Sequence, residues 1–195
     1  MKPGIIVWST CVLLIACGGQ KAVPVEAPPE DITDPTEGPF PPPAENDDVA
    51  TATADLFPTV GNDVHGKVEF IMKDGKMRVI ATVEGLTPGK HGFHIHEYGD
   101  CSAEDGTSAG GHFNPEGVAH GSPTSEPHHV GDLGNLDADA DGNAVLDFVD
   151  PMLTFEGEHD ILNRAIIVHA GEDDFVSQPT GAAGPRVACG VIKEN

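Results

Sequence analysis

The sequence predicts an all-β domain, and three features support this prediction. The 195-residue chain contains 24 glycines and 17 prolines, residues that favour turns and interrupt helices. Apolar residues do not recur with the period of an amphipathic helix but occur in short segments that alternate with polar residues, as strands do. Clusters of turn-forming residues separate these segments at short intervals.

Seven segments are predicted as strands. They are 50–57, 64–72, 76–86, 91–97, 142–150, 161–170 and 186–192. The second and third are joined by Asp74-Gly75, a dipeptide typical of the tight turn of a β-hairpin. Two long loops, at about 98–130 and 170–185, interrupt the series, and loops of such length in a compact domain are more often functional than idle.

The first residues have the features of an export signal. Residues 1–16 contain a single basic residue, Lys2, and an apolar run that is too short to cross a bilayer, so we expect a signal peptide. The sequence LIA before Cys17 resembles the bacterial lipobox, in which the cysteine becomes the lipidated first residue of the mature protein. Gly18 follows it rather than Asp, which by resemblance to bacterial sorting signals favours the outer membrane, on its periplasmic or its cell-surface face.

Residues 17–48 are predicted to form a linker. This tract is rich in proline and acidic residues and poor in aromatic ones, so it cannot bury enough apolar surface to fold. The expected organisation is therefore a lipidated Cys17, a disordered tether and one domain at 49–195. With 32 acidic against 10 basic residues, the formal charge is −22, and nucleic acid is excluded as a partner because binding a polyanion requires a basic face.

The histidines indicate a metal site. His94 and His96 lie two positions apart in a predicted strand, so their side chains project from the same face. Further candidates occur in the first long loop, at the start of the next strand and at the end of segment 161–170: His112, His120, His129, Asp132 and His169. Neutral imidazole is the commonest protein ligand of zinc and copper, and four N or O donors complete a zinc shell.

Five motifs resemble, in order, those of the copper/zinc superoxide dismutases. They are GFHIHEYGDC at 92–101, AGGHFNP at 109–115, HHVGDLGN at 128–135, VHA at 168–170 and GPRVACGVI at 184–192. The resemblance implies an eight-stranded Greek-key β-barrel or sandwich with two functional loops. It also implies dismutation of superoxide to dioxygen and hydrogen peroxide, through a copper redox cycle with a structural zinc.

The resemblance assigns the metal ligands residue by residue. One copper ion would be bound by His94, His96, His112 and His169, and one zinc ion by His112, His120, His129 and Asp132. His112 would thus bridge the two metals and supply a proton during catalysis. His128 is ambiguous by composition, but His129 has the family spacing to Asp132, and His91 matches a structural residue. We expect His65 and His159 to be solvated.

The resemblance also implies roles beyond the ligands. Arg186 matches the residue that attracts the anionic substrate, and Asp173 matches a carboxylate that holds the free ring nitrogens of two histidines. Cys101 and Cys189 match the family's intrasubunit disulfide, and a homodimer is a further expectation. The chain departs from eukaryotic relatives because the loop between His169 and Arg186 is shorter and has no Lys or Arg.

Two other functions remain alternatives. One is a copper-holding or copper-delivering surface lipoprotein with the same fold and no turnover. The other is a metal-free adhesion module, which the seven intact ligand positions argue against. Retention of Arg186 argues against the copper-holding or copper-delivering lipoprotein.

Overall fold

The computed structural model describes residues 49–195. The described part is all-β, as predicted, apart from one 3-10 turn, η1 (Thr107–Ala109). The strands are β1 (Ala50–Pro58), β2 (His65–Lys73), β3 (Lys76–Glu84), β4 (Gly89–His96), β5 (Asp132–Ala138), β6 (Ala144–Asp150), β7 (Ala165–His169), β8 (Arg186–Val191) and β9 (Lys193–Glu194). Over residues 49–195, no helix is long and apolar enough to cross a membrane. The predicted signal peptide, Cys17 and the linker lie outside the described residues.

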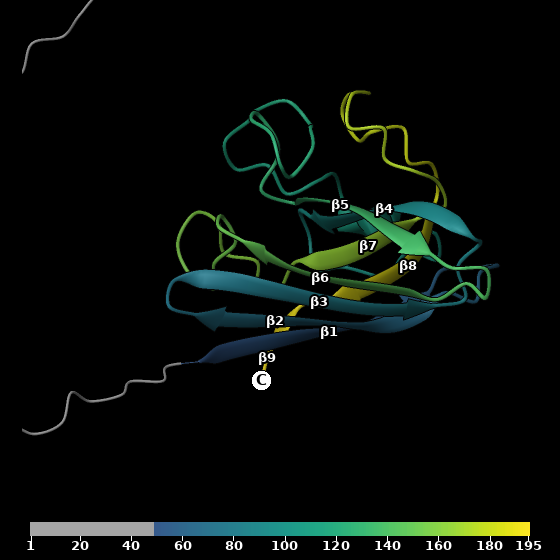
Figure 1. Ribbon diagram of the computed structural model, residues 1–195, viewed down its shortest axis with the longest axis horizontal. Helices are drawn as coiled ribbons and strands as arrows, with labels where there is room; N and C mark the ends of the chain where they lie inside the picture. The colour runs from purple at the N-terminus through teal and green to yellow at the C-terminus, as the bar shows by residue number, and fades with distance from the viewer. Residues whose placement is uncertain (1–48) are drawn as a thin grey trace, which may run out of the picture. The chain divides into compact units, whose positions relative to one another are not determined.

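The strands form a nearly closed antiparallel barrel (Figure 1). Their spatial order is β5-β4-β7-β8-β1-β2-β3-β6, with the short β9 paired to β1. The chain returns from β6 to place β7 beside β4, which is the Greek-key connection. The barrel therefore has two halves, one of β1, β2, β3 and β6 and the other of β4, β5, β7 and β8, joined where β1 pairs with β8.

Buried and exposed side chains alternate along the strands, and the buried ones form the core. In β3, Met77, Val79 and Ala81 are fully buried, whereas Arg78 between them faces solvent. Phe70 of β2 is also fully buried and is the register partner of Val79. Burying one such large apolar side chain stabilises the fold by about 1.5–3 kcal/mol.

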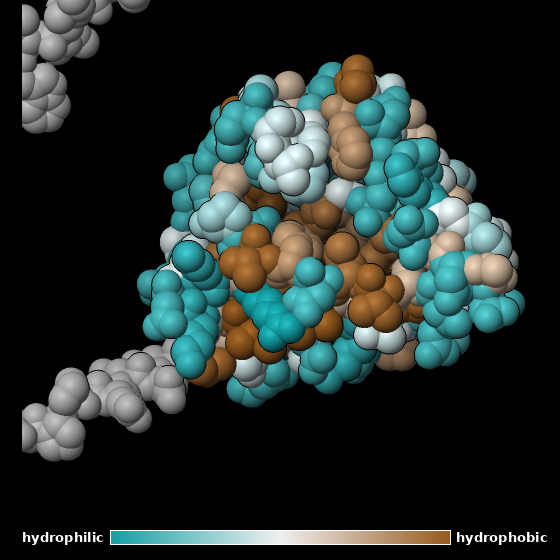
Figure 2. All heavy atoms as spheres, in the orientation of Figure 1, coloured by the Kyte–Doolittle hydropathy of each residue, from teal (hydrophilic) through white to brown (hydrophobic). Residues whose placement is uncertain are grey.

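The outer face of β3 and β6 carries apolar and charged side chains together. Figure 2 shows hydrophobic residues gathered on the front of the molecule with hydrophilic residues among them. Val145 and Val149 of β6 are 71% and 55% exposed. Between them, Asp147 accepts two hydrogen bonds from Arg78, of 2.8 and 2.6 Å, so a bidentate ion pair joins β6 to β3.

The predicted strands are confirmed with two differences. The segment 161–170 becomes a strand only at Ala165, because Asn163 has a φ of 59°, a left-handed conformation that interrupts an extended chain. None of the seven predicted segments covers β5, although a strand was expected to start near Asp132; its sequence DLGNLDA includes Gly134 at a φ of 91°.

Both predicted long loops are present. The first connects β4 to β5 and contains η1, and the second connects β7 to β8. In Figure 1 they rise from the same side of the barrel, above β4 and β5. Residues far apart in the chain are therefore placed at one surface of the barrel.

Cys101 and Cys189 form the predicted disulfide. Their Cα atoms are 5.9 Å apart, and the bond joins the first long loop to β8 across a sequence separation of 88. Closing a loop of this length reduces the conformational entropy of the unfolded chain. The disulfide therefore stabilises the fold and anchors the first loop.

We expect the double variant Cys101→Ser with Cys189→Ser to lose about 4 kcal/mol of the free energy of unfolding, the loop-entropy contribution of such a cross-link. Denaturant unfolding of the metal-free protein measures this value. Reduced wild-type protein is the control and should unfold at the midpoint of the double variant. Equal stability of the oxidised wild type and the double variant would contradict the prediction.

Candidate metal centre

Six histidines and one aspartate meet in two adjoining buried clusters. The first contains His94, His96, His112 and His169, and the second contains His112, His120, His129 and Asp132. Within each cluster, one potential ligand atom from every residue lies within 4.8 Å of the others. The structure therefore brings together all seven residues predicted as ligands, and His112 belongs to both clusters.

The two histidines of β4 point away from the barrel core. Phe93 and Ile95 belong to the hydrophobic core, so the alternating positions His94 and His96 lie on the outer face of the sheet. Both histidines are nevertheless fully buried. Both long loops contact these rings, the first through Gly110 at His96 and the second through Asp173 at His94.

Strand pairing places the other ligands beside β4. Asp132 is the register partner of His94, where a bulge shifts the pairing of β4 and β5. His112, in the first long loop, forms an isolated bridge with His96. His169 ends β7, the strand on the other side of β4. Three neighbouring chain segments thus present ligands to one point.

Hydrogen bonds identify the free nitrogens of His96 and His169. The Nδ1 atoms of these rings lie 3.0 Å from the carbonyl oxygens of Gly110 and Gly184, respectively. A carbonyl only accepts, so Nδ1 carries the hydrogen and Nε2 of each neutral ring presents a lone pair. The two Nε2 atoms face each other at 3.4 Å. Two facing lone pairs are stabilised by a cation, so this arrangement fits a metal ion.

Four other ring nitrogens are buried without a hydrogen-bond partner. They are His94 Nδ1, His112 Nε2, His120 Nδ1 and His129 Nδ1. The last two lie 3.0 and 3.2 Å from the oxygens of Asp132 but are not aligned for a hydrogen bond. An unsatisfied buried polar atom costs about 1–3 kcal/mol, and metal coordination would satisfy all four. The residues present therefore fit two metal ions.

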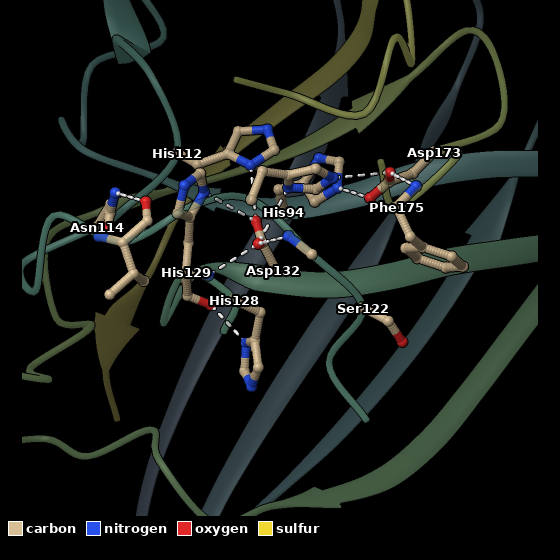
Figure 3. A network of polar contacts seen from close by, with 12 residues as sticks. His94, His112, Asn114, Ser122, His128, His129, Asp132, Asp173 and Phe175 are labelled. Carbon is tan, nitrogen blue, oxygen red and sulfur yellow. Dashed lines mark hydrogen bonds and ion pairs between the residues drawn. The ribbon is translucent and has the colours of Figure 1, made fainter. Parts of the chain in front are cut away.

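Asp173 connects the two clusters by contacting one histidine of each. Its Oδ2 lies 2.8 Å from His94 Nε2 and its Oδ1 lies 2.9 Å from His120 Nε2, and the carboxylate is fully buried. Oδ1 also accepts a hydrogen bond from the main-chain N–H of Phe175, as Figure 3 shows. One carboxylate thus orients a ring in each cluster and leaves the Nδ1 of each ring free.

Burial keeps the imidazoles of the first cluster neutral. It lowers the pKa of His94 and holds that of His96 well below its usual value. Burial and the nearby His94 lower the pKa of His169 to about 3, and burial lowers that of His112 to about 4. Neutral rings have the lone pair that a metal ligand requires.

At the second cluster, the carboxylates of Asp132 and Asp173 oppose the effect of burial on the pKa of His120. Burial lowers the pKa of His120, but the nearby carboxylates of Asp132 and Asp173 outweigh burial and raise the pKa to about 9. Burial raises the pKa of Asp132, yet its three histidine partners hold it far below its usual value. The second cluster therefore contains a permanent negative charge, which favours a divalent cation.

Arg186 lies at the edge of the first cluster. Its Nη1 and Nη2 donate to the carbonyl oxygens of Gly106 and Gly110, at 2.6 and 2.5 Å. The Gly110 oxygen is also the acceptor for His96. One carbonyl therefore positions both a ligand ring and the guanidinium. The guanidinium charge contributes to the lowered pKa of His96 and of His169.

The remaining histidines lie outside both clusters. His91 is buried between the carbonyl oxygens of Thr87 and His169, a structural role as predicted. The Nδ1 of His128 bonds the carbonyl of His129. His65 is exposed, and His159 is half-buried with its Nε2 2.9 Å from Glu116. His159 is therefore paired rather than simply solvated.

Sequence reasoning did not identify two amide side chains that support the site. Asn135 of β5 accepts from the main-chain N–H of Asp173 at 2.8 Å and donates to its carbonyl at 2.9 Å. Gln178, in the second long loop, pairs with the main chain of His120 in the same way. Asn135 belongs to the motif HHVGDLGN, which could have drawn attention to it, whereas Gln178 has no such signal.

Comparisons with known proteins agree on one family. The family described as copper/zinc superoxide dismutase (SODC) matches residues 64–192. The chain is 43% identical to an extracellular superoxide dismutase [Cu-Zn] of Brugia pahangi, over 73% of this chain and 75% of the relative. It is 48% identical to a superoxide dismutase [Cu-Zn] of Paramecium bursaria Chlorella virus 1, over 68% of this chain and 75% of the relative.

Two further matches extend the comparison. Superoxide dismutase [Cu-Zn] 5 of Dictyostelium discoideum is 43% identical over 68% of this chain and 91% of its own length. A crystal structure described as the clock protein EA4 has a TM-score of 0.67 and 41% identity, covering 73% of this chain and 93% of that one. The similarity therefore extends from sequence to fold.

Proposed function

Because this chain belongs to the copper/zinc superoxide dismutase family, we propose that its two clusters bind one copper and one zinc ion. The protein is a superoxide dismutase, which converts two superoxide ions and two protons to dioxygen and hydrogen peroxide. Copper is assigned to His94, His96, His112 and His169, and zinc to His112, His120, His129 and Asp132. The observation that carries this assignment is the pair of buried clusters that share His112.

The donor sets support this division. The first cluster offers four imidazoles, a set that suits copper, and the second offers three imidazoles and a carboxylate, a set common for zinc. When bound, copper supplies one-electron redox chemistry, and zinc supplies fixed charge without redox change. Asp173 would hold the rings of His94 and His120 in the orientation that this division requires.

His112 is the proposed proton donor. Its Nδ1 lies 2.8 Å from Asp132 Oδ1, on the side of the second cluster, whereas its Nε2 is buried in the first cluster without a hydrogen-bond partner. Nε2 can therefore accept a proton next to the position of the substrate and transfer it to the reduced product. Hydrogen peroxide requires two protons and superoxide brings none, so His112 would supply one of them and solvent water the other.

Arg186 is proposed to attract and orient superoxide. Two carbonyl oxygens hold its guanidinium in a fixed position beside His96, and a fixed guanidinium binds small anions well because its donors are already arranged. The copper-holding or copper-delivering lipoprotein without turnover is not favoured, because the curated relatives are named superoxide dismutases.

Export and membrane attachment complete the proposal. A disulfide is typical of proteins in an oxidising compartment, and one relative is named extracellular. The LIAC sequence supports lipidation at Cys17 and anchoring in the outer membrane, with residues 17–48 as a tether and 49–195 as the enzyme domain. A homodimer also stays a prediction, which sedimentation of the purified protein would test.

The ligand assignment predicts separate effects on the two metals. In His94→Ala, copper binding and nearly all activity should be lost while zinc is retained, because His94 belongs to the first cluster alone. In Asp132→Ala, zinc should be lost first. Each affinity should fall by more than the roughly 10–100-fold that loss of an outer partner costs.

Elemental analysis and superoxide turnover of the same samples measure these effects. His159→Ala is the matched control, because this histidine lies outside both clusters, and it should keep both metals. Full activity in copper-depleted His94→Ala protein would disprove the assignment.

The charge distribution predicts an unusual salt dependence. Residues 64–195 hold 22 acidic and 8 basic residues, a net −14, and no Lys or Arg lies between His169 and Arg186. Lys90, on β4, is paired with Glu172 at 3.0 Å. Screening therefore removes repulsion of superoxide as well as attraction. The second-order rate constant should stay constant or rise with ionic strength at fixed pH, and a steep fall would contradict this.

Lipidation predicts that acyl groups label Cys17 during growth with a tagged fatty acid. Cys17→Ser should lose the label and the membrane attachment, because the acyl acceptor is gone. Cys11→Ser is the control, since Cys11 lies in the predicted signal peptide and should not affect labelling. Unlabelled wild-type protein in the soluble fraction would refute the proposal.

A further inference from the structure

His120 differs from the other zinc-side residues in how its main chain is held. Asp132 lies in β5 opposite His94, and His112 forms a β-bridge with His96. His129 is tied to Asp132 by a turn, with its N–H donating to the Asp132 carboxylate at 2.8 Å. His120 instead lies in the middle of the first long loop, outside any strand or bridge of the described chain.

Gln178 supplies the main-chain pairing that His120 would have in a sheet. The N–H of His120 donates to Gln178 Oε1 at 2.9 Å, and Gln178 Nε2 donates to the carbonyl oxygen of His120, also at 2.9 Å. The same Nε2 lies 3.3 Å from the carbonyl of Val176 in its own loop. A single side chain thus satisfies both main-chain groups of one ligand residue.

The loop that carries Gln178 is itself fixed to the barrel. Asn135 of β5 pairs with both main-chain groups of Asp173. Beyond Asp173 the loop closes on itself, because the N–H of Asp174 donates to Gly181 O at 2.9 Å and the N–H of Gly181 donates to Ser177 O at 2.7 Å. Gln178 therefore lies in a loop that is held by hydrogen bonds to Asn135 and by main-chain hydrogen bonds within the loop.

Gly181 shows how closely the second long loop packs against the site. A Cβ atom at Gly181 would overlap Asp173 Oδ1 and would lie 2.7 Å from His120 Nε2. The second loop therefore packs directly against the pair formed by His120 and Asp173. It contacts His120 at both ends, at the ring through Asp173 and at the main chain through Gln178.

We propose that Gln178 is a positioning residue for zinc binding. It fixes the main chain of His120 while Asp173 fixes the ring, and together they direct Nδ1 of His120 toward the zinc-side cluster. The proposal rests on the assignment of His120 to zinc made above. Because both contacts come from one loop, the orientation of His120 depends on the position of the second loop.

The exposure of Gln178 sets the size of the expected effect. Gln178 is exposed at the loop surface, so water can replace its hydrogen bonds in part. Loss of a partner that orients a ligand costs about 10–100-fold in metal affinity. We expect Gln178→Ala to weaken zinc binding by about 10-fold, the lower end of that range, and to leave copper binding unchanged.

The experiment measures zinc affinity of the full-length protein by competition with a chromophoric chelator. The visible spectrum of Co²⁺ bound in place of zinc reports ligand geometry separately from affinity. Gln178→Glu keeps the acceptor for the His120 N–H and loses the donor to the carbonyl, so it should lie between wild type and Gln178→Ala in both measurements. Ser177→Ala is the matched loop control, because it removes a bond of 2.6 Å to Asp174 without touching His120.

The outcomes separate this proposal from the ligand assignment. Weaker zinc binding and an altered Co²⁺ spectrum in Gln178→Ala, with Ser177→Ala like the wild type, support it. Wild-type zinc affinity in Gln178→Ala, or an equal loss in Ser177→Ala, overturns it. His120→Ala is the reference: if it also retains wild-type zinc affinity, the ligand assignment itself is wrong.

Discussion

The structure depends on one constraint, the need to satisfy six buried imidazole rings that come from β4, from the end of β7 and from the first long loop. His94 and His96 point away from the core, yet neither is exposed. Ring nitrogens hidden from water need partners, and the structure provides carbonyls, carboxylates and, at the converging atoms, a place for metal ions. The first long loop carries three of these rings, and the second carries Asp173, whose carboxylate contacts His94 and His120.

The loops in turn are attached to the barrel by contacts of different kinds. The disulfide to Cys189 anchors the first loop covalently, whereas the second is held by Asn135 and by the buried carboxylate of Asp173. Asp173 contacts one histidine from each cluster. Order in the second loop is therefore coupled to order in both clusters, and the metal sites and the loops stabilise each other.

Charge is distributed differently at the centre and over the surrounding surface. The domain is strongly acidic, but the first cluster consists of neutral rings with the guanidinium of Arg186 beside it. The second cluster adds the negative charge of Asp132, and the buried carboxylate of Asp173 contacts one ring of each cluster.

The sequence by itself indicated the fold class, and its resemblance to the copper/zinc superoxide dismutases assigned all seven candidate ligands. The alternation of a strand already places His94 and His96 on one face, whereas the choice of His129 over His128 rests on the resemblance. Most strands were predicted because their apolar and polar residues alternate. The bounds of β5 were not predicted, because its polar sequence lacks that pattern. Asn163 delayed the start of the strand predicted at 161–170, through a backbone conformation that its residue type permits but does not require.

Only the tertiary structure decided which nitrogen of each ring is free and which groups hold the ligands in place. The free Nε2 of His96 follows from a carbonyl fourteen residues away, and the main chain of His120 is held by Gln178 from the other loop. Amide and carbonyl groups occur in every sequence, so no pattern marks the few that matter. They act through position, and position is set when distant segments pack together.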